Sequence, residues 1–349
     1  MAKNKGISVV ICSYNSEHRI KHVLDCLSSQ QDCENLNWEV IMVDNASTDN
    51  VVEVAKQSWN HPVVPLRILH ESRQGQSYAT RTGIENAAFH IIVMVDDDNY
   101  LSPKYIRRAY EIMENHSDVG IAGGKGTGFF EEKPPSWFGM VEQAYAIGPQ
   151  GEQEGYVGSE RGYIYGAGSI IRKSVYNYLI THNFKLIMRG RIGKSLIAGE
   201  DAERCQVFRI LGYKLWYDPL LEFEHHMPAR RINWSYTCRL FNSFGRASNY
   251  HDLYREILDK PGKFKTFIMR NAIADMLNKL RKYLEYLPAY FLVRFTGSGE
   301  GKVAVLNYNF WYGRLVEGLV NRRKIIEYRQ RIKHAEWRKE YANADIPEE

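Results

Sequence analysis

The sequence lacks several features that would assign its class at once. No apolar stretch reaches the roughly 18 residues that a membrane-spanning helix requires. A Gly-x-Gly-x-x-Gly turn is missing after the first apolar run, where Ser13-Tyr14-Asn15-Ser16 stands, and this argues against a dinucleotide-dependent dehydrogenase. A strong charge of one sign is also missing, because a net charge of +5 does not by itself indicate nucleic acid as a partner.

Cysteine is scarce and shows no pairing pattern. The five cysteines are Cys12, Cys26, Cys33, Cys205 and Cys238. An odd number without metal-type spacing indicates free thiols in a reducing compartment. Residues 1–5 lead straight into a strand and carry no targeting segment, so we expect a cytoplasmic protein, either free or at the inner face of the membrane.

The residues that are present predict an α/β fold. Hydrophobic residues make up 44% of the 349 positions, which indicates a folded chain with one large domain or two. Short β-rich runs alternate with helix-like segments, a pattern typical of a parallel sheet covered by helices. The expected strands are residues 7–12, 39–43, 66–70, 91–95 and 119–122, and the expected helices are residues 18–29, 49–58, 76–88 and 103–115.

The run Val93-Met94-Val95 ends in three carboxylates, Asp96, Asp97 and Asp98. Charge at the end of a buried strand must reach water, a cation or the hydroxyls of a ligand, because burying an unpaired carboxylate costs several kcal/mol. Mg²⁺ and Mn²⁺ take such oxygen ligands, often together with substrate phosphates. The alternative is a solvated turn before the helix that opens at Ser102-Pro103.

Polar runs also follow two other expected strands. They are Ser13 to Asn15 and Asp44 to Asp49. Ligands of parallel sheets bind beyond the carboxyl ends of the strands, so three separate segments converge on one edge and favour a binding site. Asp44 either accepts a hydrogen bond from a base or sugar, or it belongs to a turn that caps the next helix.

The second half contains three further features. Residues 123–168 are rich in glycine and aromatics and predict a long loop that either binds sugar rings or forms a small apolar cluster. Glu200 and Asp201 open a helix, where the helix dipole alone would favour acids. In the extended run 221–226, His225 should point inward with Leu221 and Phe223, as a core histidine or a ligand.

Beyond Asn233 the chain looks mostly helical. An apolar stripe predicts packing on the main domain or a membrane-surface helix. Residues 302–341 hold ten Lys/Arg against four Glu, which suits an anionic membrane surface, an acidic partner or a solvated helix face. The stripe residues are Phe264, Phe267, Ile268, Ile273, Met276, Leu277, Leu280 and Leu284.

Taken in order, five motifs between Ile7 and Tyr250 resemble the family 2 glycosyltransferases, which are inverting enzymes with the GT-A fold. The motifs are residues 9–15, residues 43–49, Asp96-Asp97-Asp98, Gly199-Glu200-Asp201, and His225-His226-Met227-Pro228 followed by Arg231. The resemblance implies a catalytic domain at residues 1–230 with an acceptor region at 123–168. Residues 231–349 would form a helical region that associates with a membrane or a partner.

The resemblance also implies roles for individual residues. Asp201 matches the catalytic base, with Glu200 beside it, while Asp98 and His225 match positions near the metal and diphosphate. The positions that match the nucleotide site are Ser13, Tyr14, Asn15, Glu17, Asp44, Asn45, Gly75, Asp96 and Asp97. The usual arginine of the loop after strand three is replaced by Thr80, so Arg73 or Arg81 is expected to substitute as a phosphate partner.

The function implied by the resemblance is transfer of a sugar from a nucleoside diphosphate sugar, most often a UDP-sugar, to a hydroxyl. Mg²⁺ or Mn²⁺ would assist, and the acceptor would be a saccharide or a lipid-linked molecule of polysaccharide or glycolipid synthesis. Two rival hypotheses stay open. A nucleotidyltransferase would release pyrophosphate, and a non-catalytic sugar-nucleotide-binding protein would leave its ligand intact.

Overall fold

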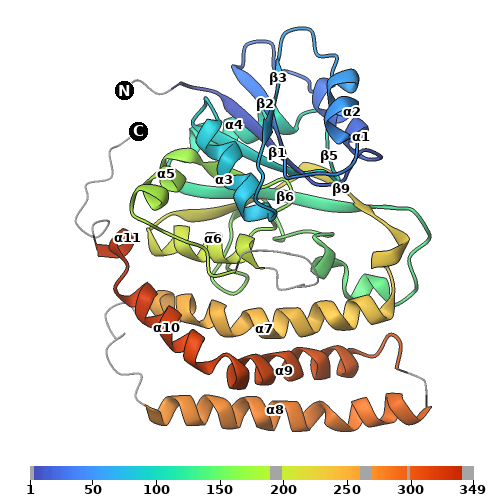
Figure 1. The fold of residues 1–349 in the computed structure, drawn as a ribbon, viewed down its shortest axis with the longest axis vertical. Helices are drawn as coiled ribbons and strands as arrows, with labels where there is room; N and C mark the ends of the chain where they lie inside the picture. Colours follow the sequence, from blue (N-terminus) through green and yellow to red (C-terminus); the bar gives the residue numbers. More distant parts are fainter. Residues whose placement is uncertain (1–3, 189–198, 260–268, 297–298, 340–349) are drawn as a thin grey trace.

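The computed structural model describes residues 4–188, 199–259, 269–296 and 299–339, and it places a mixed β-sheet above a stack of long helices (Figure 1). The strand order is β3-β2-β1-β4-β8-β6-β9-β5, and β7 pairs with β9. The strands are β1 (Ile7–Ser13), β2 (Trp38–Asp44), β3 (Leu66–His70), β4 (Ile91–Asp96), β5 (Asn99–Leu101), β6 (Val119–Phe130), β7 (Gly155–Tyr156), β8 (Ile170–Arg172) and β9 (Lys214–Met227).

The helices follow the strands in the first half and form the C-terminal third almost alone. They are α1 (Ile20–Ser28), α2 (Val51–Ser58), α3 (Gln76–Asn86), α4 (Tyr105–Asn115), α5 (Lys173–Thr181), α6 (Glu200–Ile210), α7 (Trp234–Asp259), α8 (Met269–Thr296), α9 (Val303–Val320), α10 (Arg322–Lys333) and α11 (Glu336–Lys339). Three short 3-10 turns are η1 (Phe138–Met140), η2 (Glu142–Tyr145) and η3 (Ala229–Arg231).

The predicted α/β class is confirmed, and β3, β2, β1 and β4 are parallel as expected. β-branched residues such as Val9, Val40 and Val93 lie in register and are fully buried, which suits a strand covered on both faces. The sheet is mixed further along, because β8 runs antiparallel to both β4 and β6.

The loop predicted from residue 123 is wrong for residues 123–130, which continue strand β6. Gly124 shows why glycine occurs in this strand: a Cβ there would lie 1.7 Å from the Leu221 carbonyl oxygen on the neighbouring strand β9. These glycines permit close backbone approach between paired strands, whereas glycine in a sequence usually indicates a turn.

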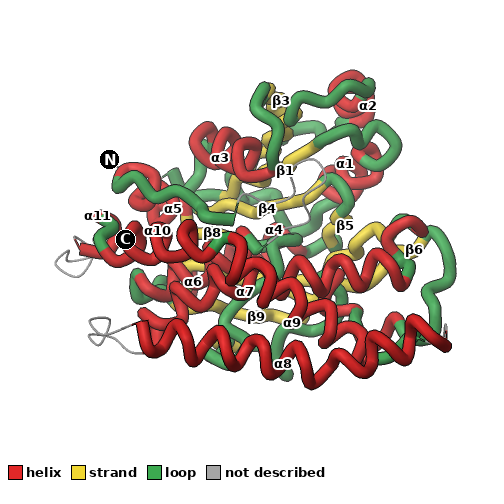
Figure 2. The backbone as a smooth tube through the Cα atoms, turned by 60° about the horizontal axis from the view of Figure 1, so that its bottom comes forward, coloured by secondary structure: helices red, strands yellow, loops and turns green. Residues whose placement is uncertain are grey.

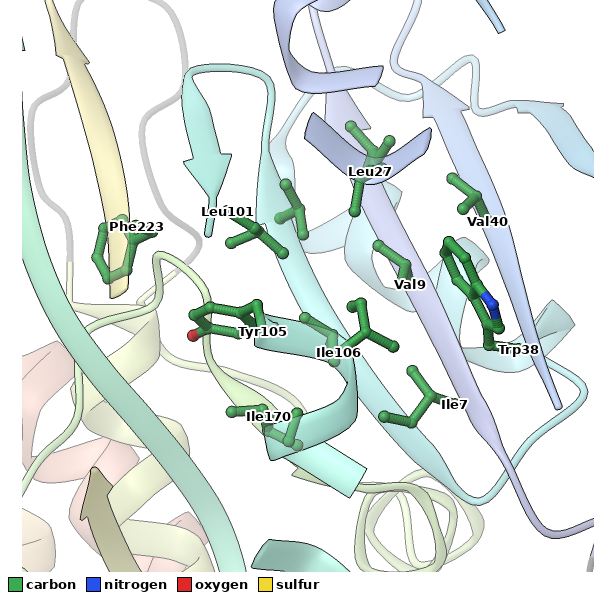
Figure 3. Packing of buried hydrophobic residues seen from close by; sticks show 14 of the residues in the cluster. Ile7, Val9, Leu27, Trp38, Val40, Leu101, Tyr105, Ile106, Ile170 and Phe223 are labelled. Carbon is green, nitrogen blue, oxygen red and sulfur yellow. The ribbon is translucent and has the colours of Figure 1, made fainter. Parts of the chain in front are cut away.

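Two cores cover the faces of the sheet. The first lies under α1 and α4, where Leu27, Tyr105 and Ile106 pack against Val9 and Ile170 (Figure 3). Fully burying a side chain such as Leu27 contributes about 1.5–3 kcal/mol. The second core joins α3, α5 and α6 to α7 on the other face. Helix α7 is therefore built into the same core as the sheet.

The C-terminal helices stack in layers, with α9 between α7 and α8 (Figures 1 and 2). Packing of the predicted apolar stripe on the main domain is wrong for Leu277, Leu280 and Leu284, which are exposed, whereas Lys279 of the same helix is buried. Phe264, Phe267 and Ile268 lie outside the described residues, as does the side chain of Ile273. Within the described ranges, no helix is both long and apolar enough to span a membrane.

Candidate active site

Strands β1, β2 and β4 end at one edge of the sheet, and the polar loops that follow them are tied together. Asn15 adopts a left-handed backbone (φ 48°), and its amide nitrogen donates to Ser47 Oγ at 3.1 Å. The Glu17 amide donates to Asp49 at 2.9 Å, and Glu17 Oε2 accepts a bond from the Asn50 amide. The two loops therefore form one rigid platform at the carboxyl edge.

A cavity of about 1410 Å³ opens beside this edge. It is walled by the sheet edge, residues 143–146, 159–163 and 165–167, the start of α6, and one face of α7. Ten of the residues implied by the family resemblance line it together, which are Ser13, Tyr14, Asn45, Gly75, Asp96, Asp97, Asp98, Glu200, Asp201 and His225.

Five others do not line the cavity. Asn15 and Glu17 belong to the loop platform. Asp44 is held beneath it, where it accepts bonds from the Ser47 amide at 3.0 Å and from His70 at 2.9 Å. Burial would raise the pKa of Asp44, but these partners lower it overall. The remaining two are Arg73 and Arg81.

The structure does not bring Arg73 or Arg81 to the cavity as phosphate partners. Arg73 donates from Nε and Nη2 to the carboxylate of Glu71, both at 2.8 Å. Arg81 pairs with Glu85 one helical turn away. Both guanidinium groups are engaged by local carboxylates outside the cavity lining.

Asn45 links the second and third strand loops. Its amide group donates to the Arg73 carbonyl at 2.7 Å, and its Oδ1 accepts a bond from the Gly75 amide at 2.8 Å. Gly75 then starts α3 with φ 134°, a region that favours glycine. Asn45 thereby positions the start of α3 on the cavity wall.

The three acids after β4 have different surroundings. Gln76 donates to Asp96 at 2.7 Å, whereas Asp97 accepts bonds from Arg19 and from the Tyr14 amide, both at 3.0 Å. Burial and the neighbouring charge of Asp98 raise the pKa of Asp97 despite Arg19. Asp97 therefore has a structural partner in Arg19.

Asp98 meets His225, the inward histidine predicted for β9. Asp98 Oδ1 lies 3.5 Å from His225 Nε2, and Asp98 Oδ2 lies 3.5 Å from Arg231 Nη1. Burial alone would raise the pKa of Asp98, but the charges of His225 and Arg231 lower it well below the usual range. These two partners therefore stabilise the ionised form of Asp98.

The Asp98–His225 pair fits a divalent cation that also binds a substrate. His225 Nδ1 lies 2.8 Å from the Tyr145 carbonyl oxygen, and a proton on Nδ1 donated to that oxygen would leave the lone pair of Nε2 available to a cation beside Asp98. No group of three or more metal-binding side chains occurs among the residues that the structure describes. The protein part of such a site is thus two ligands, and phosphate oxygens would complete it, as is common for Mg²⁺.

Glu200 and Asp201 begin α6 on the opposite wall. The preceding Gly199 has φ 136°, and its amide donates to Glu200 Oε2 at 3.1 Å. Asp201 Oδ2 accepts a bond from the Gly166 amide at 3.1 Å. Burial and the adjacent Asp201 charge raise the pKa of Glu200. The carboxylate of Asp201 is thus held by a donor from outside α6, whereas that of Glu200 bonds to the residue directly before it.

The α7 wall of the cavity was not predicted from the sequence. Leu240, Phe244, Ala247, His251 and Arg255 line the cavity from this helix. Their spacing of three or four residues puts them on one helical face. This spacing can be recognised in the sequence, but it is equally typical of a helix face that packs in the core. Helix α9 adds Phe310 and Arg314 to the same wall.

The sequence model of Glycosyl transferase family 2 matches residues 8–179. Among curated proteins, poly(ribitol-phosphate) beta-N-acetylglucosaminyltransferase TarS of Staphylococcus aureus is 28% identical over 120 residues, or 34% of this chain and 21% of TarS. Dolichol-phosphate mannosyltransferase of Pyrococcus furiosus is 30% identical over 125 residues, 34% of each chain. The chain therefore spans about a fifth to a third of the length of these relatives.

Among solved structures, mannosyltransferase PcManGT from Pyrobaculum calidifontis, in complex with GDP-Man and Mn²⁺, is similar over 92% of this chain and 91% of its own. The TM-score is 0.55 and the sequence identity is 15%. At this identity the likeness shows the fold, which is the GT-A fold of the glycosyltransferases with a helical C-terminal region.

Proposed function

We propose that this chain, which carries a glycosyl transferase family 2 domain, is an inverting glycosyltransferase that moves a sugar from a nucleoside diphosphate sugar to an acceptor hydroxyl. The observation that carries the proposal is the meeting of Asp98, His225 and Asp201 around one cavity. One wall offers a cation site for a diphosphate, and the other offers a carboxylate base.

The donor would lie along the sheet edge. Tyr14 and Asn45 would border the nucleotide, and Asp44 and the loop platform would support it from below. The family resemblance favours a UDP-sugar. A GDP-sugar is the alternative, because the PcManGT structure contains GDP-Man.

Asp98 and His225 would hold Mg²⁺ or Mn²⁺ beside the diphosphate. A divalent cation bound there would neutralise the charge that develops on the leaving diphosphate. Arg231, 3.5 Å from Asp98, adds a second positive charge at the same end of the cavity. These groups stabilise the leaving group and do not touch the acceptor.

Asp201 would act as the general base. An acceptor hydroxyl is a poor nucleophile until it loses its proton, and a positioned carboxylate can accept that proton as the new bond forms. Attack from the face opposite the diphosphate inverts the anomeric centre. Glu200 lies beside the base in the first turn of α6.

The acceptor would enter along α7. A cavity of about 1410 Å³ exceeds the roughly 300–1,000 Å³ typical of a site for one small ligand. Leu240 and Phe244 make part of the α7 wall apolar, and His251 and Arg255 make part of it polar. We propose a saccharide or lipid-linked acceptor of polysaccharide or glycolipid synthesis.

A donor panel tests the proposal. Thermal stabilisation is measured with uridine and guanosine diphosphate sugars, with and without Mn²⁺, and the products with an acceptor are then identified. Release of a nucleoside diphosphate supports the proposal. Release of pyrophosphate would indicate a nucleotidyltransferase, and binding without turnover of any acceptor would indicate a non-catalytic binding protein.

A further inference from the structure

Arg204 is a buried arginine on the wall of the cavity. It lies on α6, one turn after Asp201, and only 7% of it is exposed. It lines the cavity with Cys12 of β1 and Thr80 of α3, which are themselves in contact at 3.5 Å. The charge of Arg204 acts on Cys12, next to the end of β1, so Arg204 lies near the sheet edge along which the donor is proposed to bind.

Within the described ranges, Arg204 forms no hydrogen bond and no ion pair. Its Nε atom is wholly buried without an acceptor. An uncompensated buried charge costs several kcal/mol, and a guanidinium cannot avoid that cost by losing its proton. Such a group in a native fold calls for a missing partner.

The acids of the cavity do not supply that partner. Glu200 lies one turn before Arg204 on α6, but its carboxylate accepts the Gly199 amide. Asp201 is bonded to the Gly166 amide, and Asp97 to Arg19. The positive charge of Arg204 acts to lower the pKa of Glu200 from a distance, without a hydrogen bond or ion pair between them. The guanidinium donors of Arg204 are therefore available to a ligand that enters the cavity.

We propose that Arg204 binds the donor, pairing with two anionic oxygens that belong either to the diphosphate or to a carboxylate on the transferred sugar. The planar guanidinium matches both groups, which share the geometry of two oxygens on one centre. The inference rests on the proposed function, because it takes the ligand of this cavity to be a nucleoside diphosphate sugar. It replaces the expectation that Arg73 or Arg81 contacts the donor.

The test is calorimetric binding to wild-type protein and to Arg204→Met. The probes are UDP, UDP-glucose and UDP-glucuronic acid with Mn²⁺, or GDP, GDP-mannose and GDP-mannuronic acid if the donor panel selects guanosine. We expect Arg204→Met to lose about 10- to 100-fold in affinity, the range for a hydrogen bond between charged groups. Loss for all three probes assigns the diphosphate, and loss for the uronic acid donor alone assigns the sugar carboxylate.

Two controls separate binding from folding. Arg107→Met removes the same charge from α4, where Arg107 pairs with Glu111 outside the cavity, and should leave affinity unchanged. Ligand-free Arg204→Met should melt at the same or a higher temperature than the wild type, because it removes an uncompensated buried charge. Arg204→Lys keeps the charge without the planar fork and should bind with intermediate affinity.

Unchanged affinity of Arg204→Met for all three probes would overturn the inference. The proposed function would still stand in that case, because the wild type would bind the nucleotide probes. A lower melting temperature of Arg204→Met without ligand would also overturn it, because that result indicates a structural role. Failure of the wild type to bind any of the probes would instead count against the proposed function itself.

Discussion

The carboxylate of Asp201 accepts a hydrogen bond from the Gly166 amide at 3.1 Å. This contact joins the start of α6 to the loop that precedes β8. Asp201 Oδ1 accepts the Ala202 amide at 2.8 Å, so both oxygens are oriented by backbone donors. Gly166 also matters by its size, because a Cβ there would lie 3.3 Å from the Asp201 Cβ.

Asp201→Asn should retain donor binding and lose about 10²- to 10⁴-fold in turnover, since only removal of the acceptor proton is impaired. Donor affinity by calorimetry and product release by chromatography measure the two effects separately. Glu53→Gln, which neutralises a surface acid paired with Lys56 on α2, is the matched control and should turn over normally. Normal turnover by Asp201→Asn would remove Asp201 from the mechanism.

Asp98→Ala should abolish the part of nucleotide binding that depends on Mn²⁺, because Asp98 supplies the only carboxylate of the proposed cation site. His225→Ala should weaken the same dependence less severely, since the charged carboxylate ligand remains. The measurement is nucleoside diphosphate affinity with Mn²⁺ and with a chelator. If wild-type affinity is equal in the two conditions, the metal assignment fails.

Glu203 gives the protein a pH-dependent stability. Burial raises the pKa of Glu203 to about 7, although Tyr254 and the amides of Ile187 and Met188 donate to it. The folded protein therefore holds this proton more tightly than the unfolded chain. The resulting stabilisation is fully present below pH about 4.5 and is lost as the pH rises through 7.

Glu203→Gln cannot ionise, so its melting temperature should gain on the wild type as the pH rises from 5 to 8. The relative change should approach about 3 kcal/mol, as a shift from 4.5 to about 7 corresponds to 1.36 kcal/mol per pKa unit. Scanning calorimetry at each pH provides the comparison. A melting-temperature difference that stays constant with pH would contradict the assignment.

Much of the sheet and the site was predictable from the sequence. Buried β-branched runs predicted β1, β2 and β4, and carboxylates at their ends predicted the shared edge. Strand alternation correctly turned His225 inward and left His226 half-buried, where it pairs with Glu131. These predictions depend on the spacing of apolar residues and on the order of the motifs, both of which can be taken directly from the sequence.

The wrong predictions concern contacts that cannot be predicted from residue spacing or motif order. Strand β8 is only three residues long, too short for a pattern. Arg73 was expected to contact a phosphate, yet its guanidinium forms an ion pair with Glu71, two residues away in the sequence. The basic residues of the C-terminal region looked like a free excess, yet Arg314 pairs with Asp252 and Arg329 with Glu256 of α7.

An exposed apolar face on α8 predicts membrane association. Leu277 and Leu284 are 59% and 51% exposed, and Phe291 and Phe295 are 47% and 83% exposed. They lie along one side of the helix, with the exposed Arg281 beside them. In proteins that bind lipid surfaces, an amphipathic helix lies in the interface and its basic residues contact anionic headgroups.

Leu284→Glu combined with Phe295→Glu should therefore reduce binding to phosphatidylglycerol vesicles by at least about tenfold, since each change removes buried apolar area worth roughly 1.5–3 kcal/mol. Vesicle sedimentation measures the effect. Leu220→Glu changes another exposed leucine, on β9, and should bind as the wild type does. Equal sedimentation of all three proteins would leave this face without a membrane role.

Gly245 holds the α7 wall against α9. A Cβ at Gly245 would lie 1.9 Å from the Phe310 carbonyl oxygen and 3.0 Å from the Arg314 amide nitrogen. Both obstacles are helix backbone, which cannot rotate away as a side chain would. Gly313 makes the reciprocal approach, with a Cβ position 2.1 Å from the Asn242 carbonyl oxygen.

Gly245→Ala should therefore push α7 and α9 apart and destabilise the fold by about 1–3 kcal/mol, although alanine is the better helix former. A melting curve detects the loss, and Gly139→Ala, where nothing lies within 4 Å of the new Cβ, should melt like the wild type. Because Phe244 and Phe310 line the cavity from these two helices, acceptor turnover should fall more than donor affinity. Wild-type stability in Gly245→Ala would show that the two helices do not pack this closely, and the acceptor wall would have to be placed elsewhere.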